Sequence, residues 1–99
     1  MENVISTLEL IEKEQIPSIK FSQTDVLTDP LERQKRLKDV SRATVLGNGY
    51  HGKVTICFQT ADDETKCVTT TIWDFDKEYI ILKSGSSIPL KAVFRVEFS

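Results

Sequence analysis

The stretch Val54-Thr55-Ile56-Cys57-Phe58-Gln59 decides how the second half of this chain folds. Its apolar residues Val54, Ile56 and Phe58 alternate with polar or smaller residues, which is the period of two expected of a half-buried β-strand. An acidic turn, Ala61-Asp62-Asp63-Glu64, follows shortly afterwards. We therefore expect a β-hairpin whose first strand begins at Val54.

Further segments with strand character follow this turn up to the C-terminus. They run from Lys66 to Phe75, from Tyr79 to Lys83, from Ile88 to Leu90 and from Ala92 to Phe98. Pro89 has no N–H for a β-ladder, so its strand belongs at an edge or a corner. Five closely spaced strands predict a small, strongly bent and closed or nearly closed barrel, because closure removes exposed strand edges.

One long helix is expected before the strands. Asp29 suits the N-cap, Pro30 the first helical position and Glu32 the third, where its side chain can reach back to the cap. The helix is expected to end near Leu46, with Gly47 as its C-cap. The fold class predicted for residues 29–99 is therefore mainly β, one helix followed by a five-stranded small barrel.

Residues 1–28 form a separate N-terminal appendage in this interpretation. Val4, Leu8 and Ile11 have the spacing of one helical face, so a short helix ending before Pro17 is favoured. The alternative is a short strand over residues 7–11. The apolar side chains in 16–21 either dock on the domain or meet a partner.

Composition limits the classes of function. The 99 residues, 39% of them hydrophobic, suffice for one core and not for two. Since 13 basic and 15 acidic residues give a net charge of −2, no overall positive field attracts nucleic acid. No apolar run approaches the ~20 residues of a membrane helix, and the first residues lack the layout of a secretory leader. A cytoplasmic location with no membrane partner is expected.

The two cysteines test the register of the hairpin. If Ile56 lies opposite Val68 on the buried face, Cys57 lies directly opposite Cys67 on the other face. The alternative register shifts the pairing by one residue and places Phe58 opposite Cys67. In a reducing cytoplasm we expect the two thiols to be free, with a bond between them only after oxidation in air.

No catalytic, cofactor-binding or metal-ligating set is expected. The G-x-G-x-x-G pattern of residues 47–52 follows a helix and precedes a strand, which is the reverse of the dinucleotide-binding order. The single histidine, His51, lies within this glycine-rich loop. The acidic residues 62–64, Asp74 and Asp76 are expected to lie in turns and to have a structural role there. The protein is therefore expected not to be an enzyme.

The basic residues of the main helix are the strongest charge feature. They are candidates for contact with nucleic acid or with an acidic partner: Arg33, Lys35, Arg36, Lys38 and Arg42. The alternative is a solvated helix face in which Glu32–Arg36 and Lys35–Asp39 form ordinary ion pairs one turn apart.

Self-association has its own candidate residues. Trp73 is either a core anchor or an exposed anchor in an interface, where tryptophan is enriched. The apolar stripe of Val4, Leu8 and Ile11 must bury against this domain or against a second copy.

The segment Ile72-Trp73-Asp74-Phe75-Asp76-Lys77-Glu78-Tyr79-Ile80-Ile81-Leu82 resembles the part of Sm-like small barrels in which an apolar strand ends at an aromatic–Asp pair, turns and resumes. The resemblance covers residues 29–99 and implies an Sm-like or SH3-like fold. Where Sm proteins carry a base-binding Asn and a later Arg-Gly pair, this chain has Tyr79-Ile80 and residues 86–90. The resemblance therefore implies the fold without its RNA site.

The chain also resembles a group of short uncharacterised bacteroidete proteins, in residues 46–50, 70–73 and 88–90. That resemblance implies a bacterial origin. Taken together, the sequence predicts a non-catalytic interaction module, self-associating or binding another protein. The alternative is a nucleic-acid-binding regulator that uses the basic helix.

Overall fold

The computed structural model describes residues 8–98. Its elements in chain order are β1 (Glu9–Ile11), a 3-10 helix (Lys13–Ser18), α1 (Pro30–Tyr50), β2 (Val54–Gln59), β3 (Thr65–Thr70), β4 (Ile72–Phe75), β5 (Tyr79–Leu82), β6 (Ser87–Pro89), a second 3-10 helix (Leu90–Ala92) and β7 (Val93–Phe98). Helix and strand occur in similar shares, so the fold class is mixed α and β rather than mainly β.

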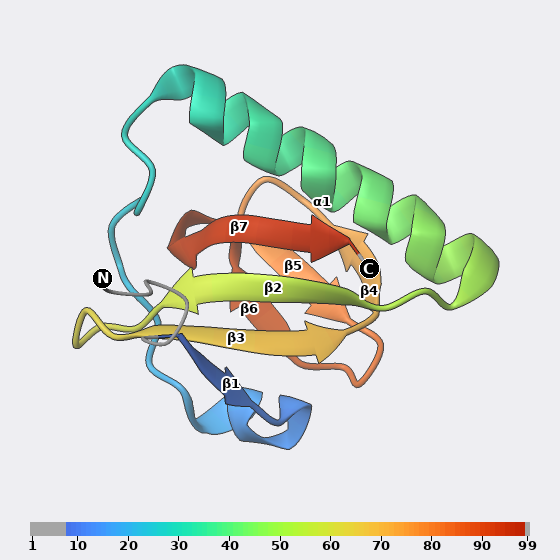
Figure 1. The fold of residues 1–99 in the computed structure, drawn as a ribbon, viewed down its shortest axis with the longest axis horizontal. Coiled ribbons are helices and arrows are strands. Elements are labelled where there is room, and N and C mark those ends of the chain that lie inside the picture. Colours follow the sequence, from blue (N-terminus) through green and yellow to red (C-terminus); the bar gives the residue numbers. More distant parts are fainter. Residues whose placement is uncertain (1–7, 99) are drawn as a thin grey trace, which may run out of the picture.

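The described strands form two sheets, with the order β1-β3-β2-β7 in one and β4-β5-β6 in the other. Figure 1 shows one sheet in front of the other, with α1 running along the upper side of both. The long strand expected from Lys66 to Phe75 is divided at Thr71, where the chain passes from the first sheet to the second. The strands form two separate sheets, so the closed or nearly closed barrel predicted for residues 29–99 is not confirmed. Helix α1 packs on β7 of one sheet and on β4 of the other.

The start of α1 confirms the predicted N-cap. The carboxylate of Asp29 accepts a hydrogen bond of 2.9 Å from the backbone N–H of Leu31, and Pro30 occupies the first helical position. The residues that α1 buries are Arg36, Val40, Ala43 and Gly47. Leu37, three residues before Val40, is exposed.

The end of α1 corrects the prediction that Gly47 is the C-cap. The helix continues to Tyr50, and His51 takes the left-handed conformation with φ 54°. Gly47 is instead a packing residue, because a Cβ at this position would lie 2.2 Å from the carbonyl oxygen of Ile72. Close approach of α1 to β4 thus explains this glycine.

The N-terminal segment is not the helix that the sequence favoured. Residues Glu9–Ile11 form β1, which pairs in parallel with Lys66–Val68 of β3. Ile11 lies opposite Val68 and is buried in the core, so tertiary pairing overrides the weak helical spacing. Val4 lies outside the described residues. Pro17 lies inside the 3-10 helix that follows β1.

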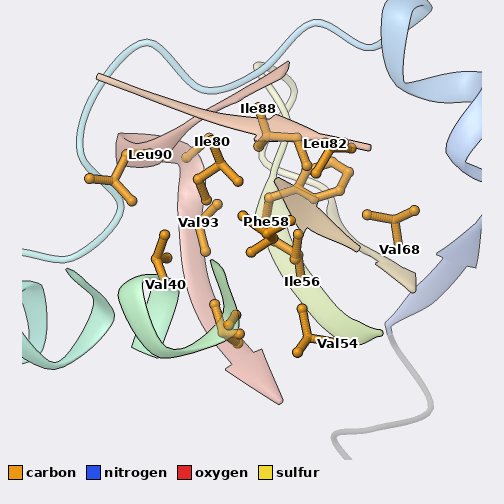
Figure 2. Close-up of a cluster of buried hydrophobic side chains, with 14 of the residues drawn as sticks. Val40, Val54, Ile56, Phe58, Val68, Ile80, Leu82, Ile88, Leu90 and Val93 are labelled. Atoms are coloured by element: carbon orange, nitrogen blue, oxygen red, sulfur yellow. The ribbon is translucent and has the colours of Figure 1, made fainter. Parts of the chain in front are cut away.

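A single core lies between the two sheets and under α1. Figure 2 shows Ile80, Leu82 and Ile88 of the second sheet directed toward Ile56 and Phe58 of the first. Ile16 of the N-terminal segment belongs to the same core, and Ile19 and Phe21 pack against it. The apolar side chains of residues 16–21 therefore dock on the domain.

The hairpin of β2 and β3 has the predicted register. Ile56 lies opposite Val68 and Cys57 opposite Cys67, with 4.1 Å between the Cα atoms of the two cysteines. In this structure the two sulfurs are joined in a disulfide, which is the state expected after oxidation. The edge position predicted for Pro89 is also confirmed, since β6 is the outer strand of the second sheet.

Candidate interaction surface

The outer face of the second sheet carries a group of exposed apolar side chains. Trp73 is 46% exposed, Tyr79 45% and Ile81 37%, and Pro89 is half-buried beside them. Tyr79 and Ile81 are two residues apart on β5 and share one face, and Tyr79 lies opposite Pro89 of β6. We call these four residues the β5 face. Asp74 of β4 and Ser87 of β6 lie opposite Ile81 in the ladder, so the exposed apolar side chains of this face are interspersed with polar ones. Exposed tryptophan and tyrosine side chains are candidates for an interaction site.

Trp73 lies at a register shift in the pairing of β4 with β5. Ile72 lies opposite Leu82 in the ladder, whereas the next paired residue, Asp74, lies opposite Ile81, so Trp73 is the additional residue. Its carbonyl oxygen accepts a hydrogen bond of 2.9 Å from the side-chain amide of Asn48 on α1. Trp73 is therefore held at the backbone while much of its indole remains exposed.

The turn between β4 and β5 is fixed by Asp76. Its carboxylate accepts hydrogen bonds of 2.8 Å from the backbone N–H groups of Glu78 and Tyr79. These two bonds hold the pKa of the Asp76 carboxyl below its usual value. Asp74 accepts a bond from the N–H of the adjacent Phe75 in β4. The Asp76 carboxylate thus positions the start of β5 and its Tyr79.

A hollow of about 540 Å³ adjoins the β5 face at Tyr79 and Pro89. Its other wall comes from Phe21 and the residues that follow it, and Lys77 and Lys91 stand at its rim. Phe21 is fixed because its ring packs on the core residue Phe58, with ring centres 5.0 Å apart. The hollow gives the β5 face a concave border.

Two of the residues predicted for self-association lie elsewhere. Ile11 is buried in the protein's own core, and Leu8 is half-buried next to β1. Trp73 is on the opposite sheet from β1. The structure therefore separates Trp73 from the N-terminal residues with which the sequence grouped it.

Four of the five basic residues on α1 have partners within the protein. Arg36 binds Asp25, Arg33 binds the carbonyl oxygen of Leu27 and contacts Asp25, Lys35 pairs with Asp39, and Arg42 lies 4.3 Å from the centre of the Phe98 ring. Lys38 has no ion pair with any described residue. The predicted Lys35–Asp39 pair is confirmed, and Arg36 pairs with Asp25 instead of Glu32.

The Arg36–Asp25 pair ties the N-terminal segment to α1. Two hydrogen bonds, of 2.8 and 2.9 Å, join the guanidinium to the carboxylate, and Arg36 also donates to the carbonyl oxygen of Val93 at 2.9 Å. Burial by itself would raise the pKa of the Asp25 carboxyl. Hydrogen bonds from Arg36 and the N–H of Leu27, with the charges of Arg36 and Arg33, outweigh burial and hold this pKa below its usual value.

The glycine-rich loop borders a second hollow, of about 620 Å³. His51 and Lys53 line it on one side, and Lys83 and the residues after β1 line it on the other. His51 itself closes α1, its N–H donating to the carbonyl oxygen of Gly47 at 3.0 Å. The loop therefore acts as a helix end rather than as a phosphate cradle.

Within residues 8–98, no group of three or more His, Cys, Asp or Glu side chains is placed to hold a metal ion. No helix in this range is long and apolar enough to cross a membrane.

Tyr79, Ile81 and Pro89 were missed as site residues in the sequence. The run Tyr79-Ile80-Ile81-Leu82 has no polar residue, so its alternation does not reveal which side faces outward. The signal that identifies the face comes from its neighbours, because Ile80 opposes the buried Ile88.

Comparison with protein-family models, with curated proteins and with solved structures finds no match.

Proposed function

We propose that this protein is a non-catalytic interaction module that self-associates through the β5 face. The observation that carries the proposal is the exposure of Trp73 on β4 together with that of Tyr79 and Ile81 on the neighbouring strand β5. Tryptophan and tyrosine in such a position contribute strongly to binding because they bury a large area and lose few rotamers. A second copy is the partner that we propose for the face.

The hydrogen bonds that fix the backbone around the β5 face support the proposed association. Trp73 is held through its carbonyl by Asn48, and Asp76 fixes the turn before Tyr79. The face therefore needs little ordering on binding, which reduces the entropic cost of association.

We also place the chain in the small-barrel class, with an Sm-like or SH3-like plan. Support comes from the order of the strands, because β2 pairs with both β3 and β7 in one sheet while β4, β5 and β6 form the other. The passage from β3 to β4 across Thr71, and the 3-10 helix between β6 and β7, give the chain the compact corners that such a plan requires.

A non-catalytic role is supported by the duties of the reactive side chains. Asp74 in β4 and Asp76 in the following turn accept backbone hydrogen bonds, and His51 occupies the left-handed position at the end of α1. Within residues 8–98, none of the three is hydrogen-bonded to a Ser, Thr or Cys side chain, as the activation of a nucleophile requires.

The fluorescence of Trp73 tests the proposal directly, because it is the only tryptophan in the chain. With rising protein concentration we expect the emission to move to shorter wavelength and quenching by acrylamide to weaken. The Leu31→Ser variant serves as control, since Leu31 is exposed on α1 away from the face. Emission and quenching that stay constant at every concentration would contradict the proposal.

The nucleic-acid alternative is separated by a salt series. Labelled RNA and DNA are titrated at two salt concentrations with wild type and with Lys38→Ala. Because four of the five basic side chains of α1 have internal partners, we expect weak binding that the Lys38 variant hardly changes. Tight binding that falls steeply with salt, as counterion release requires, would favour the alternative.

A further inference from the structure

We propose that Cys57 and Cys67 form a reversible thiol–disulfide site, which low-molecular-weight disulfides such as oxidised glutathione close and small thiols open without a change of fold. The site lies on the outer face of the first sheet, whereas the β5 face belongs to the second. The inference therefore does not depend on the proposed self-association.

The pairing register of β2 with β3 is the first observation that supports a reversible disulfide. Cys57 and Cys67 are directly opposite each other in a ladder that extends from Val54–Thr70 to Gln59–Thr65. Their Cα atoms are 4.1 Å apart, which is close to the spacing of a directly opposed antiparallel pair. Ladder pairs on both sides hold the two strands in place whether or not the sulfurs are bonded.

The neighbouring pair on the same face shows that opposed side chains meet across these strands. The hydroxyl oxygens of Thr55 and Thr69 are 3.0 Å apart. The cysteines are the next pair on that face, so the thiols meet by the same geometry. The second thiol is therefore present at high effective concentration beside the first.

Burial differs between the two cysteines and sets the order of reaction. Cys57 is 1% exposed and lies between β3 and β7, opposite Arg95. Cys67 is 6% exposed and lies opposite Leu10 of β1, a strand of three residues at the edge of the sheet. Short edge strands open more readily than central ones, so Cys67 is the thiol that a reagent reaches first.

The chemistry balances as two successive exchanges. The thiolate of Cys67 attacks one sulfur of oxidised glutathione, the glutathione disulfide breaks, and one glutathione thiolate leaves. The thiolate of Cys57 then attacks the Cys67 sulfur, the mixed disulfide breaks, and the second glutathione thiolate leaves. The two leaving thiolates take up the two protons that the cysteines lose. Two protein thiols are oxidised and one glutathione disulfide is reduced.

The test follows the mass of the folded, fully reduced protein in an excess of oxidised glutathione. We expect wild type to lose two hydrogen atoms and to keep no glutathione, and we expect dithiothreitol to restore the reduced mass. The circular dichroism spectrum stays the same, and the melting midpoint is higher in the oxidised protein.

Two single variants separate the roles of the cysteines. Cys57→Ala has no resolving thiol, so it accumulates glutathione bound at Cys67. Cys67→Ala retains only the more buried thiol and reacts at least tenfold more slowly. Alanine keeps both sites apolar, and the wild-type measurement stands alone should either variant fail to fold.

Three results would overturn the proposal. The first would be a folded wild-type protein that keeps two free thiols under conditions in which the urea-unfolded chain reacts. The second would be oxidation to disulfide-linked dimers instead of the internal bond. The third would be a change in the circular dichroism spectrum on oxidation, because it would mean that the strands must move to form the bond.

Discussion

Arg36 lies buried between α1 and β7, and Asp25 supplies the carboxylate that balances its charge. An arginine of this kind is stabilised only while its partner is ionised, because an uncompensated charge in the interior is costly. Asp25 is thus a structural residue, although it lies in a segment without regular structure between the first 3-10 helix and α1.

Replacing Asp25 should show this dependence. We expect Asp25→Asn to lower the free energy of unfolding by on the order of 3 kcal/mol near neutral pH, because the guanidinium of Arg36 loses its counter-charge. Urea titrations of the variant and of wild type measure the loss. An equal free energy of unfolding for both proteins would rule out the role given to the pair.

The pH dependence of the same comparison has a defined sign. The pKa of Asp25 is below its usual value in the folded protein, so its contribution is present above the pKa of the unfolded chain and is lost as the pH falls through the folded pKa. We therefore expect the difference between wild type and Asp25→Asn to shrink as the pH is lowered below about 4. A difference that is constant with pH would contradict this expectation.

Gly47 and Gly49 provide a matched test of how closely α1 packs on β4. We expect Gly47→Ala to destabilise the protein, because its Cβ would meet the carbonyl oxygen of Ile72 at 2.2 Å and force α1 away from β4. Gly49→Ala has open space around its Cβ, so helix propensity should make it neutral or stabilising by up to about 1 kcal/mol. Thermal melts of the two variants compare them. Equal effects would show that α1 does not approach β4 in this way.

The N-terminal segment contributes to the core through Ile16, which is 1% exposed. We expect Ile16→Ala to lower the free energy of unfolding by about 2–5 kcal/mol, as large-to-small core substitutions do. Leu10→Ala is the control, because Leu10 is 68% exposed on β1 and surface substitutions usually change stability by no more than about 0.5 kcal/mol. A small effect of Ile16→Ala would mean that this segment does not pack on the domain.

How far the sequence predicts these elements depends on whether the signal is local. The start of α1 at Asp29 and the register of β2 and β3 were predictable, since a cap needs only adjacent residues and a register only the parity of the apolar ones. The strand β1 was not, because a three-residue segment takes its conformation from β3. The end of α1 was missed because Gly47 serves packing against β4, and chain-local rules do not contain that contact.

For the molecule as a whole, the sequence indicated a small domain with successive strands. It did not indicate that these strands divide into two sheets. The position of α1 over one strand of each sheet is a tertiary property. The site was predictable only in Trp73, because no local pattern distinguishes the two faces of β5. The basic helix suggested nucleic acid, yet the residue that neutralises Arg36 is Asp25, which lies before the helix and outside its pairing pattern.

Sedimentation equilibrium tests the central claim most directly, that the protein associates with itself through the β5 face. For wild type and the Leu31→Ser control, we expect the weight-average mass to rise above the 11.3 kDa of one chain as the concentration increases. For the double variant Trp73→Ser, Ile81→Ser, we expect the mass of one chain throughout, because the face has lost its aromatic anchor and its central aliphatic residue. A wild-type protein that stays at 11.3 kDa at every concentration, or a double variant that associates as wild type does, would contradict the account.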